Sequence, residues 1–375
     1  MRFIFTCGGT AGHINPALGV AGRIRELMPD AEFLFVGAQG HMETELVPRE
    51  GYEIVTIPIS GFRRSLKPKM LWENVKTVGR LAVSTAKACK YIREFKPDAA
   101  IGTGGYVCYP VLKAAADMGI PTVAHESNAV PGLTTKMLEK RVDRIMVGFE
   151  ESRQFYRHPD KVEVTGTPVR VDFRGAEKLR ARRQLGLRSD QPIVLAVFGS
   201  LGAGYMNDAM CRFIRRMDGD ENFRLIYATG KQYYDEVLAN LNANGGVPAN
   251  ADVREYIYDM PMVMSAADVI ICRGGASTIS ELTYLGKPAV IVPSPNVVNN
   301  HQEKNARVLE SAGAAKVMLE GEFDGGGLYD TVAGLLRDQT ALDGMCAASR
   351  ALSVDDATDR IVSAVLGLAE KGRKG

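Results

Sequence analysis

The 375-residue sequence lacks several patterns that would place it in a special class of protein. Its cysteines show no CxxC spacing, which argues against a zinc or dithiol redox motif and predicts buried free thiols. No apolar run approaches the roughly 20 residues needed to cross a bilayer. The N-terminus, MRFIFTCGG, runs directly into a strand-like segment without a signal-peptide pattern. We therefore expect a soluble, cytoplasmic protein whose six thiols are free: Cys7, Cys89, Cys108, Cys211, Cys272 and Cys346.

The sequence also lacks a strong excess of charge. Lys and Arg number 46 and Asp and Glu 44, so the formal net charge is +2 and no general affinity for nucleic acid is expected. Residues 61–98 are the exception, with ten Lys or Arg against three Asp or Glu, a local excess of 10 − 3 = +7. A partner surface for this stretch would therefore be anionic.

Short apolar strands alternate with helical patterns along most of the chain, which predicts an α/β protein with parallel, doubly wound sheets. A chain of this length suits two domains of roughly 150 to 200 residues each. The proline of TGTPVR (residues 165–170) biases the chain toward an extended linker. We predict two similar Rossmann-like domains facing a cleft, 1–164 and 165–351, with a terminal helix at about 352–370 packing back on the first.

The most informative stretch is residues 268–305, DVIICRGGASTISELTYLGKPAVIVPSPNVVNNHQEKN. It is typical of a buried strand, a glycine loop and a helix from Ser277 to Leu285. The first N–H groups of such a helix attract phosphate, and Ser277 and Thr278 add hydroxyl donors. Glu281, one turn further on, could accept hydrogen bonds from a ribose diol. A strand, glycine turn and helix also occur without any ligand, but Glu281 and the polar NNHQEKNA loop favour a nucleotide-sugar site.

The first strand leads into GGTAGHINPALGVA, with glycines at 8, 9 and 12 and a helix expected to begin near Asn15 and Pro16. The spacing differs from the dinucleotide fingerprint GxGxxG, and His13 lies inside the expected loop. His13 could cap the helix or act as a base; we favour the base, since loops at strand ends carry chemistry in such folds. Two further loops, GTGGYVCYP (102–110) and HESNAVPGLTTK (125–136), are expected at the same edge of the sheet.

Residues 61–95 contain two segments with different patterns. Helical spacing from Val75 to Ile92 indicates the core face of a helix. Ahead of it, the basic–apolar segment (residues 62–72) mixes cations with apolar side chains, which suits an anionic membrane surface, although composition alone also allows a solvated loop. Its candidate membrane residues are Phe62, Arg63, Arg64, Lys67, Lys69, Met70, Leu71 and Trp72.

Taken together, these motifs resemble the MurG family of peptidoglycan glycosyltransferases over nearly the whole chain. The resemblance rests on GGTAGHINPALGVA, GTGGYVCYPV, HESNAVPGLTTK, VTGTPVR, GSLGA and RGGASTISEL through NNHQEKNA, in that order. It implies a GT-B architecture and an inverting transfer of N-acetylglucosamine from UDP-N-acetylglucosamine to the 4-hydroxyl of the muramyl sugar of lipid I, giving lipid II. It implies no cofactor and no catalytic metal. It also makes a membrane surface the favoured interpretation of the basic–apolar segment. It implies a peripheral location on the cytoplasmic face of the cell membrane, where other cell-wall synthesis proteins could be partners.

The resemblance also assigns residues by position. His13 and Glu126 become the candidate catalytic residues, and the residues alone leave open which of them is the base. Glu281 would bind the ribose, the backbone of Ile257 the uracil, and Ala276, Ser277 and Thr278 the diphosphate. The full set expected to contact UDP-N-acetylglucosamine is Thr10, Gly12, His13, Asn128, Arg170, Ser200, Ile257, Ala276, Ser277, Thr278, Glu281 and Gln302.

The chain departs from the family pattern at Phe198, where many members have glycine, and at Leu201, where glutamine is frequent. Three alternative functions remain: a lipid galactosyltransferase, a UDP-N-acetylglucosamine 2-epimerase, or a nucleotide-sugar binding protein without turnover. An epimerase is expected to have additional acidic and histidine residues in the cleft and no basic apolar surface loop.

Overall fold

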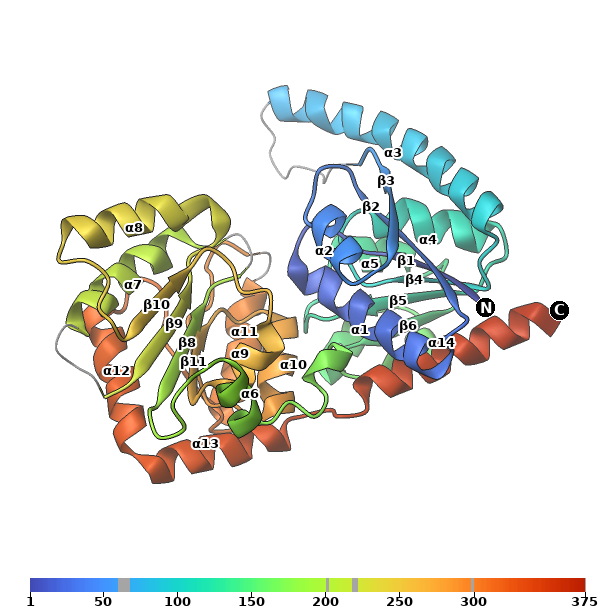
Figure 1. Cartoon of the computed structure of the whole chain (residues 1–375). Helices are drawn as coiled ribbons and strands as arrows, with labels where there is room; N and C mark the ends of the chain where they lie inside the picture. The colour runs from blue at the N-terminus through green and yellow to red at the C-terminus, as the bar shows by residue number, and fades with distance from the viewer. Residues whose placement is uncertain (60–67, 200–201, 218–221, 298–299, 375) are drawn as a thin grey trace. The chain divides into compact units, whose positions relative to one another are not determined.

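The structure is a computed structural model that describes residues 1–59, 68–199, 202–217, 222–297 and 300–374, the side chains of 68–78 and 374 excepted. The chain divides into two compact units, Met1–Val171 with Asp355–Gly375, and Asp172–Val354. Figure 1 shows a parallel sheet with helices on both faces in each unit. The doubly wound fold predicted from the alternating pattern is therefore confirmed.

The sheet of the first unit has the strand order β3-β2-β1-β4-β5-β6-β7, and every pair of neighbours is parallel. Its central strands are short, almost wholly apolar runs such as FIF and AAI, as expected for strands buried on both faces. The strands are β1 (Arg2–Thr6), β2 (Glu32–Ala38), β3 (Glu53–Ile57), β4 (Ala99–Gly102), β5 (Thr122–Glu126), β6 (Arg144–Val147) and β7 (Val162–Val164).

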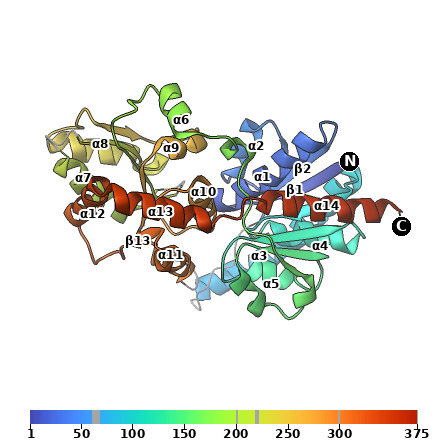
Figure 2. The same cartoon turned by 90° about the horizontal axis from the view of Figure 1, so that it is seen from below.

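Two cores cover the two faces of this sheet, and alternate residues of each strand point into one or the other. Phe3 and Phe5 belong to the core under α1, α2 and α14, whereas Ile4 belongs to the core under α3, α4 and α5. Helix α14 packs on α1, as Figures 1 and 2 both show. The helices are α1 (Ala11–Leu27), α2 (Glu43–Arg49), α3 (Pro68–Phe95), α4 (Cys108–Asp117), α5 (Leu133–Leu138) and α14 (Ala357–Lys374), with short 3-10 helices η1 (Glu150–Phe155), η2 (Pro159–Lys161) and η3 (Val171–Phe173).

The sheet of the second unit has the order β10-β9-β8-β11-β12-β13 and is also parallel throughout. Its strands are β8 (Ile193–Val197), β9 (Arg224–Ala228), β10 (Ala251–Arg254), β11 (Val269–Cys272), β12 (Ala289–Ile291) and β13 (Ala315–Val317). Its helices are α6 (Lys178–Gln184), α7 (Gly204–Arg216), η4 (Lys231–Tyr233), α8 (Tyr234–Ala243), α9 (Met260–Ala266), α10 (Ala276–Leu285), α11 (His301–Ser311), α12 (Gly325–Arg337) and α13 (Gln339–Ala351).

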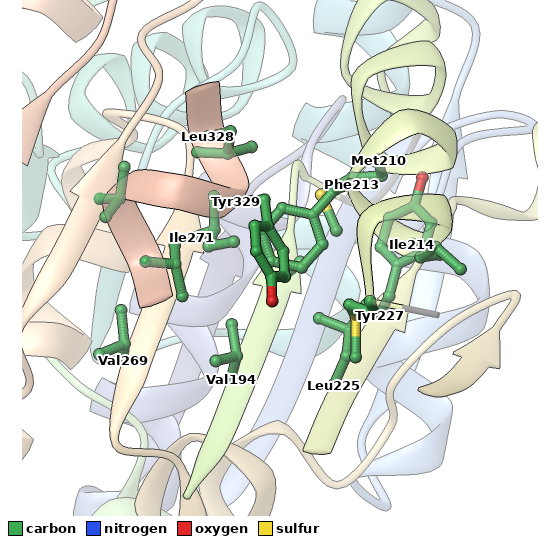
Figure 3. Close-up of a cluster of buried hydrophobic side chains, with 14 of the residues drawn as sticks. Val194, Met210, Phe213, Ile214, Leu225, Tyr227, Val269, Ile271, Leu328 and Tyr329 are labelled. Carbon is green, nitrogen blue, oxygen red and sulfur yellow. The ribbon is translucent and has the colours of Figure 1, made fainter. Parts of the chain in front are cut away.

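One face of this second sheet carries a core of aromatic and aliphatic side chains beneath α7 and α12 (Figure 3). Phe213 and Tyr329 meet edge to face with ring centroids 5.5 Å apart. The buried Tyr227 satisfies its hydroxyl by donating to Oδ1 of Asn207 at 2.6 Å, so its burial leaves no unpaired polar group. This packing fixes the strand ends from which the glycine loops emerge.

Two predictions about composition can be compared with the structure. The six thiols are free; four are buried, and Cys89 and Cys346 are half-buried. Across the described ranges of the chain, the structure contains no helix long and apolar enough to span a bilayer.

Candidate functional site

Each sheet has one point at which the chain reverses its direction of travel across the sheet. In the first unit β1 lies between β2 and β4, and in the second β8 lies between β9 and β11. The loops that follow two such strands diverge to opposite sides, and ligands of open α/β sheets bind at this opening. The topology therefore selects residues 7–10 and 103–107 in the first unit, and, among the described residues of the second, 198–199, 202–203 and 273–275.

The loop after β1 ends earlier than the sequence indicated. Helix α1 begins at Ala11, and the backbone N–H of His13 already donates to the carbonyl of Thr10 at 3.0 Å. The prediction of a helix start near Asn15 and Pro16 was wrong, because Pro16 is tolerated inside the helix with one missing N–H. His13 is thus the third residue of α1, while Thr10 is exposed and Gly12 is half-buried.

The imidazole of His13 is held from two sides. Its Nδ1 lies 2.9 Å from the carbonyl oxygen of Gly8, and Gly104, at φ +123°, leaves the space that the ring occupies. A Cβ at Gly104 would lie 2.4 Å from Cδ2 of His13. A carbonyl oxygen can only accept, so Nδ1 carries the hydrogen and Nε2 of the neutral ring keeps its lone pair. The hydroxyl of Thr103 also donates to the His13 carbonyl at 2.6 Å.

The carboxylate of Glu126 is largely buried, at 6% exposure, and it makes four hydrogen bonds. Oε1 accepts from the backbone N–H of Asn128 at 3.1 Å and from its side-chain Nδ2 at 3.0 Å. Oε2 accepts from the backbone N–H of Gly132 and from the hydroxyl of Thr135, both at 2.9 Å. Glu126 therefore ties the 128–132 loop to the start of α5, and Asn128 stands half-buried in that loop.

His125, the residue before Glu126, was not selected from the sequence. Its Nε2 lies 3.1 Å from the carbonyl of Gly166, and the hydroxyl of Ser127 lies 3.3 Å from its Nδ1. Burial lowers the pKa of His125 to about 4, because the charged form would lose its hydration. It therefore packs as a neutral ring under the loop that carries Asn128.

Arg170 lies at the end of the TGTPVR segment, within the first compact unit. Its Nη2 is 3.0 Å from Oε1 of Glu50, so its guanidinium is engaged by a partly exposed carboxylate. The compact unit extends to Val171, whereas the sequence places the start of the second domain at residue 165.

In the second unit, β11 leads through Arg273, Gly274 and Gly275 into α10. A Cβ at Gly274 would lie 2.2 Å from the carbonyl oxygen of Gln302, so only glycine fits against α11 there. Arg273 pairs with Glu320 at 2.5 Å and donates to the carbonyl of Val292 at 3.0 Å. These contacts fix the loop directly before the N-terminus of α10.

The first turn of α10 carries Ala276, which is buried, and Ser277 and Thr278, which are half-buried. Glu281 follows one turn later with 7% exposure. Burial, with the negative charge of Glu281 as a smaller cause, raises the pKa of Cys272 to about 12, which indicates that the carboxylate lies near the end of β11. The structure thus brings together, at one helix start, four of the residues assigned to the nucleotide.

Helix α11 supports the same loop from behind. The Nδ2 of the fully buried Asn305 donates to the Gly274 carbonyl at 3.1 Å, a contact that sequence reasoning missed. Gln302 is half-buried and uses Oε1 to accept from the backbone N–H of Ser294 at 2.9 Å. The spacing of Gln302 and Asn305, three residues apart on one helix, could have indicated a shared face.

The structure describes only some of the remaining predicted site residues. Ile257 is buried. The tyrosines on either side of it in the sequence, Tyr256 and Tyr258, have ring centroids 4.6 Å apart, and Nζ of Lys231 lies 5.7 Å from the centre of the Tyr258 ring. Ser200 lies outside the described residues. So do Phe62, Arg63, Arg64 and Lys67, while Lys69, Met70, Leu71 and Trp72 fall on the backbone of α3, where side chains are not described. Among the described residues, no three His, Cys, Asp or Glu side chains gather as a metal site.

Comparisons with known proteins agree over the whole chain. The model of the glycosyltransferase family 28 N-terminal domain matches residues 3–147, and that of its C-terminal domain matches residues 193–361. The UDP-N-acetylglucosamine–N-acetylmuramyl-(pentapeptide) pyrophosphoryl-undecaprenol N-acetylglucosamine transferase of Acetivibrio thermocellus is 42% identical over 376 residues, covering 100% of both chains.

Solved structures give the architecture. The crystal structure of MurG from Acinetobacter baumannii matches with a TM-score of 0.69 at 27% identity, covering 98% of this chain and 99% of that one. A UDP-GlcNAc 2-epimerase from Neisseria meningitidis reaches 0.67 at 14% identity, covering 98% and 100%, and therefore shares the fold alone. The two Rossmann-like units are those of a GT-B glycosyltransferase, and the chain belongs to glycosyltransferase family 28, in its MurG branch.

Proposed function

We propose that the chain is an inverting glycosyltransferase that moves N-acetylglucosamine from UDP-N-acetylglucosamine to the 4-hydroxyl of the muramyl sugar of lipid I, forming lipid II. The observation that carries this proposal is the full-length 42% identity to a transferase of that name. The position of glycine-containing loops at both switch points supports it, because open α/β sheets bind ligands there.

The second unit is the proposed donor site. The first backbone N–H groups of α10 have no acceptor within the helix, and they lie at the positive end of the helix dipole, which suits the diphosphate of UDP. Ser277 and Thr278 add hydroxyl donors, Glu281 accepts from the ribose hydroxyls, and the backbone of Ile257 reads the uracil. Gln302 contacts the sugar and Ser200 completes the set in this unit, whereas Asn128 and Arg170 belong to the first unit. As the glycosidic bond breaks, the same donors stabilise the negative charge that develops on UDP.

His13 is the proposed general base. The 4-hydroxyl oxygen attacks C1 of N-acetylglucosamine, its proton passes to Nε2 of His13, and the electron pair of the broken C1–O bond leaves on UDP. The Nδ1 contact to Gly8 supports this role because it leaves Nε2 as the acceptor. Glu126 is the weaker candidate, because all four of its hydrogen bonds hold its own loop.

The first unit is proposed to lie peripherally on the anionic cytoplasmic face of the cell membrane, since the acceptor is a membrane-bound lipid. The basic–apolar segment, residues 62–72, would be the docking surface. The described part of α3 supports this location, because it exposes Arg80, Lys87, Lys90 and Arg93 along one helix. Each cation near an anionic surface contributes about 1 kcal/mol.

The direct test is transfer of labelled N-acetylglucosamine from the UDP donor to a short-tailed lipid I analogue. The proposal expects labelled disaccharide product that forms only when the acceptor is present. Conversion of UDP-N-acetylglucosamine to its 2-epimer without acceptor would instead support an epimerase. Donor binding without either product would support the non-catalytic alternative.

A further inference from the structure

Another buried carboxylate, that of Glu43, contacts the His13 loop, and neither the sequence motifs nor the proposed chemistry assigns it a role. Glu43 is the first residue of α2 and is fully buried. Its Oε1 accepts from the backbone N–H of Ala38 at 2.8 Å, and its Oε2 accepts from the backbone N–H of Gly9 at 3.1 Å. A carboxylate is thus placed in the interior by two backbone amides.

The slot that holds this side chain is built by glycines. A Cβ at Gly37 would lie 2.6 Å from Cγ of Glu43, and a Cβ at Gly8 would lie 2.5 Å from its Oε1. Val107 closes the other side of Gly8, at 3.0 Å from the same hypothetical Cβ. Glu43 therefore has little freedom to move, and neither has the backbone at Gly8.

The contact to Gly9 matters because of the geometry of one peptide bond. The N–H of Gly9 and the carbonyl of Gly8 belong to the same planar unit and point in opposite directions across it. Its N–H donates to Glu43 at 3.1 Å, and its carbonyl accepts from Nδ1 of His13 at 2.9 Å. A carboxylate, a peptide group and an imidazole thus form a continuous hydrogen-bonded chain, in which each bond polarises the next.

We propose that Glu43 is a positioning residue for His13 and acts through the Gly8–Gly9 peptide. By fixing that peptide, Glu43 aims the Gly8 carbonyl at Nδ1, which sets the tautomer and keeps Nε2 as the proton acceptor. Its negative charge also favours the imidazolium that forms when the proton arrives. This inference rests on His13 as the base in the proposed function.

The test uses Glu43→Gln in the full-length enzyme, because glutamine keeps the shape but has only one acceptor atom. The amide nitrogen would face the N–H of either Ala38 or Gly9, and two donors cannot form a hydrogen bond with each other. We expect kcat to fall by about tenfold to a hundredfold, the range found when a group that orients a metal-binding histidine is removed, with the KM for UDP-N-acetylglucosamine unchanged. In a His13→Ala background the same substitution should lower kcat no further.

A spectroscopic readout does not depend on turnover. In protein labelled with ¹⁵N-histidine, loss of a signal in His13→Ala assigns His13 among the five histidines. The wild type should show Nδ1 protonated and Nε2 unprotonated, and Glu43→Gln should show a mixture of tautomers. If Glu43→Gln does not fold, Glu43→Asp, which keeps the charge but is one methylene too short for both contacts, should give the same change.

Glu139→Gln is the matched control. Glu139 is also buried in the first unit, and its Oε1 accepts from the backbone N–H groups of Arg157 and His158. Both contacts use one oxygen, which glutamine keeps, so this variant removes the charge of a buried carboxylate elsewhere in the first unit and should retain kcat and the His13 signal. A Glu43→Gln enzyme with normal kcat or an unaltered His13 tautomer would overturn the inference, as would an Nε2-protonated His13 in the wild type. Full turnover in His13→Ala would instead overturn the base assignment itself.

Discussion

Replacement of Glu126 by glutamine separates a role in holding the loop from a role in taking the proton. Glutamine keeps one oxygen, which can still accept from the backbone and side chain of Asn128. The new amide nitrogen lies where Oε2 accepted from Gly132 and Thr135. The Thr135 hydroxyl can turn and accept from the amide, but the Gly132 N–H then faces another donor.

The expected loss is therefore one hydrogen bond to a charged group, about 1.5 to 3 kcal/mol. Gly132 is exposed, so water can replace part of the contact and the lower value of about 1.5 kcal/mol applies. For a unit of this size the midpoint of thermal unfolding falls by about 2 to 4 °C per kcal/mol, or roughly 3 to 6 °C in all. Because Nε2 of His13 remains in place, kcat should fall less than tenfold, whereas loss of a general base removes about a hundredfold or more.

Calorimetric unfolding and steady-state transfer on the same preparation measure both quantities. Thr135→Val is the control, since it removes one donor to Oε2 and leaves the carboxylate charged; it should lower the unfolding midpoint slightly and leave kcat intact. An unchanged midpoint for Glu126→Gln together with a loss of kcat beyond a hundredfold would refute the reasoning and make Glu126 the base.

Three other predictions follow from the structure. Glu281→Ala should weaken UDP-N-acetylglucosamine binding by roughly tenfold to a hundredfold, since a charged hydrogen bond is worth about 1.5 to 3 kcal/mol; calorimetric titration with unchanged affinity would remove Glu281 from the site. His125 has a folded pKa of about 4, below its ordinary 6.5, so the unfolded chain gains its proton first as pH falls, and up to about 3 kcal/mol of stability is lost between pH 6.5 and 4. Urea unfolding at several pH values should show this loss, and His125→Asn should lack that component. Charge reversal of all four cations of the basic–apolar segment should abolish binding to anionic vesicles at about 1 kcal/mol per cation, while activity on a short-tailed acceptor survives; undiminished sedimentation with vesicles would locate the membrane surface elsewhere.

The architecture could be predicted because alternation of apolar strands and helices is a local signal. Runs such as IVLAV and VIIC mark strands buried on both faces, and the structure confirms both parallel sheets. The predicted start of α1 was wrong by several residues. Proline is a strong signal for the first turn of a helix, whereas the true start at Ala11 has no side-chain cap that the sequence would reveal.

The grouping of residues at the start of α10 was predictable because they are close in sequence. Gly274, Ser277 and Glu281 lie within eight residues of one another, so a strand-loop-helix pattern places them together. Glu43 could not be found in this way, because its partner Gly9 lies 34 residues away and a glutamate in the first turn of a helix is ordinarily solvated. The family resemblance made Glu126 a candidate base, but the sequence could not reveal that its four hydrogen bonds hold its own loop.

The central claim is that the base lies in the first unit and the donor binds to the second. Its most direct test is His13→Ala, with kcat measured by transfer to the short-tailed acceptor and Kd for UDP-N-acetylglucosamine measured by calorimetry. The account predicts that kcat falls by about a hundredfold or more while Kd changes by less than about twofold, well under 1.4 kcal/mol. Near-normal turnover, or a loss that resides wholly in Kd, would contradict it.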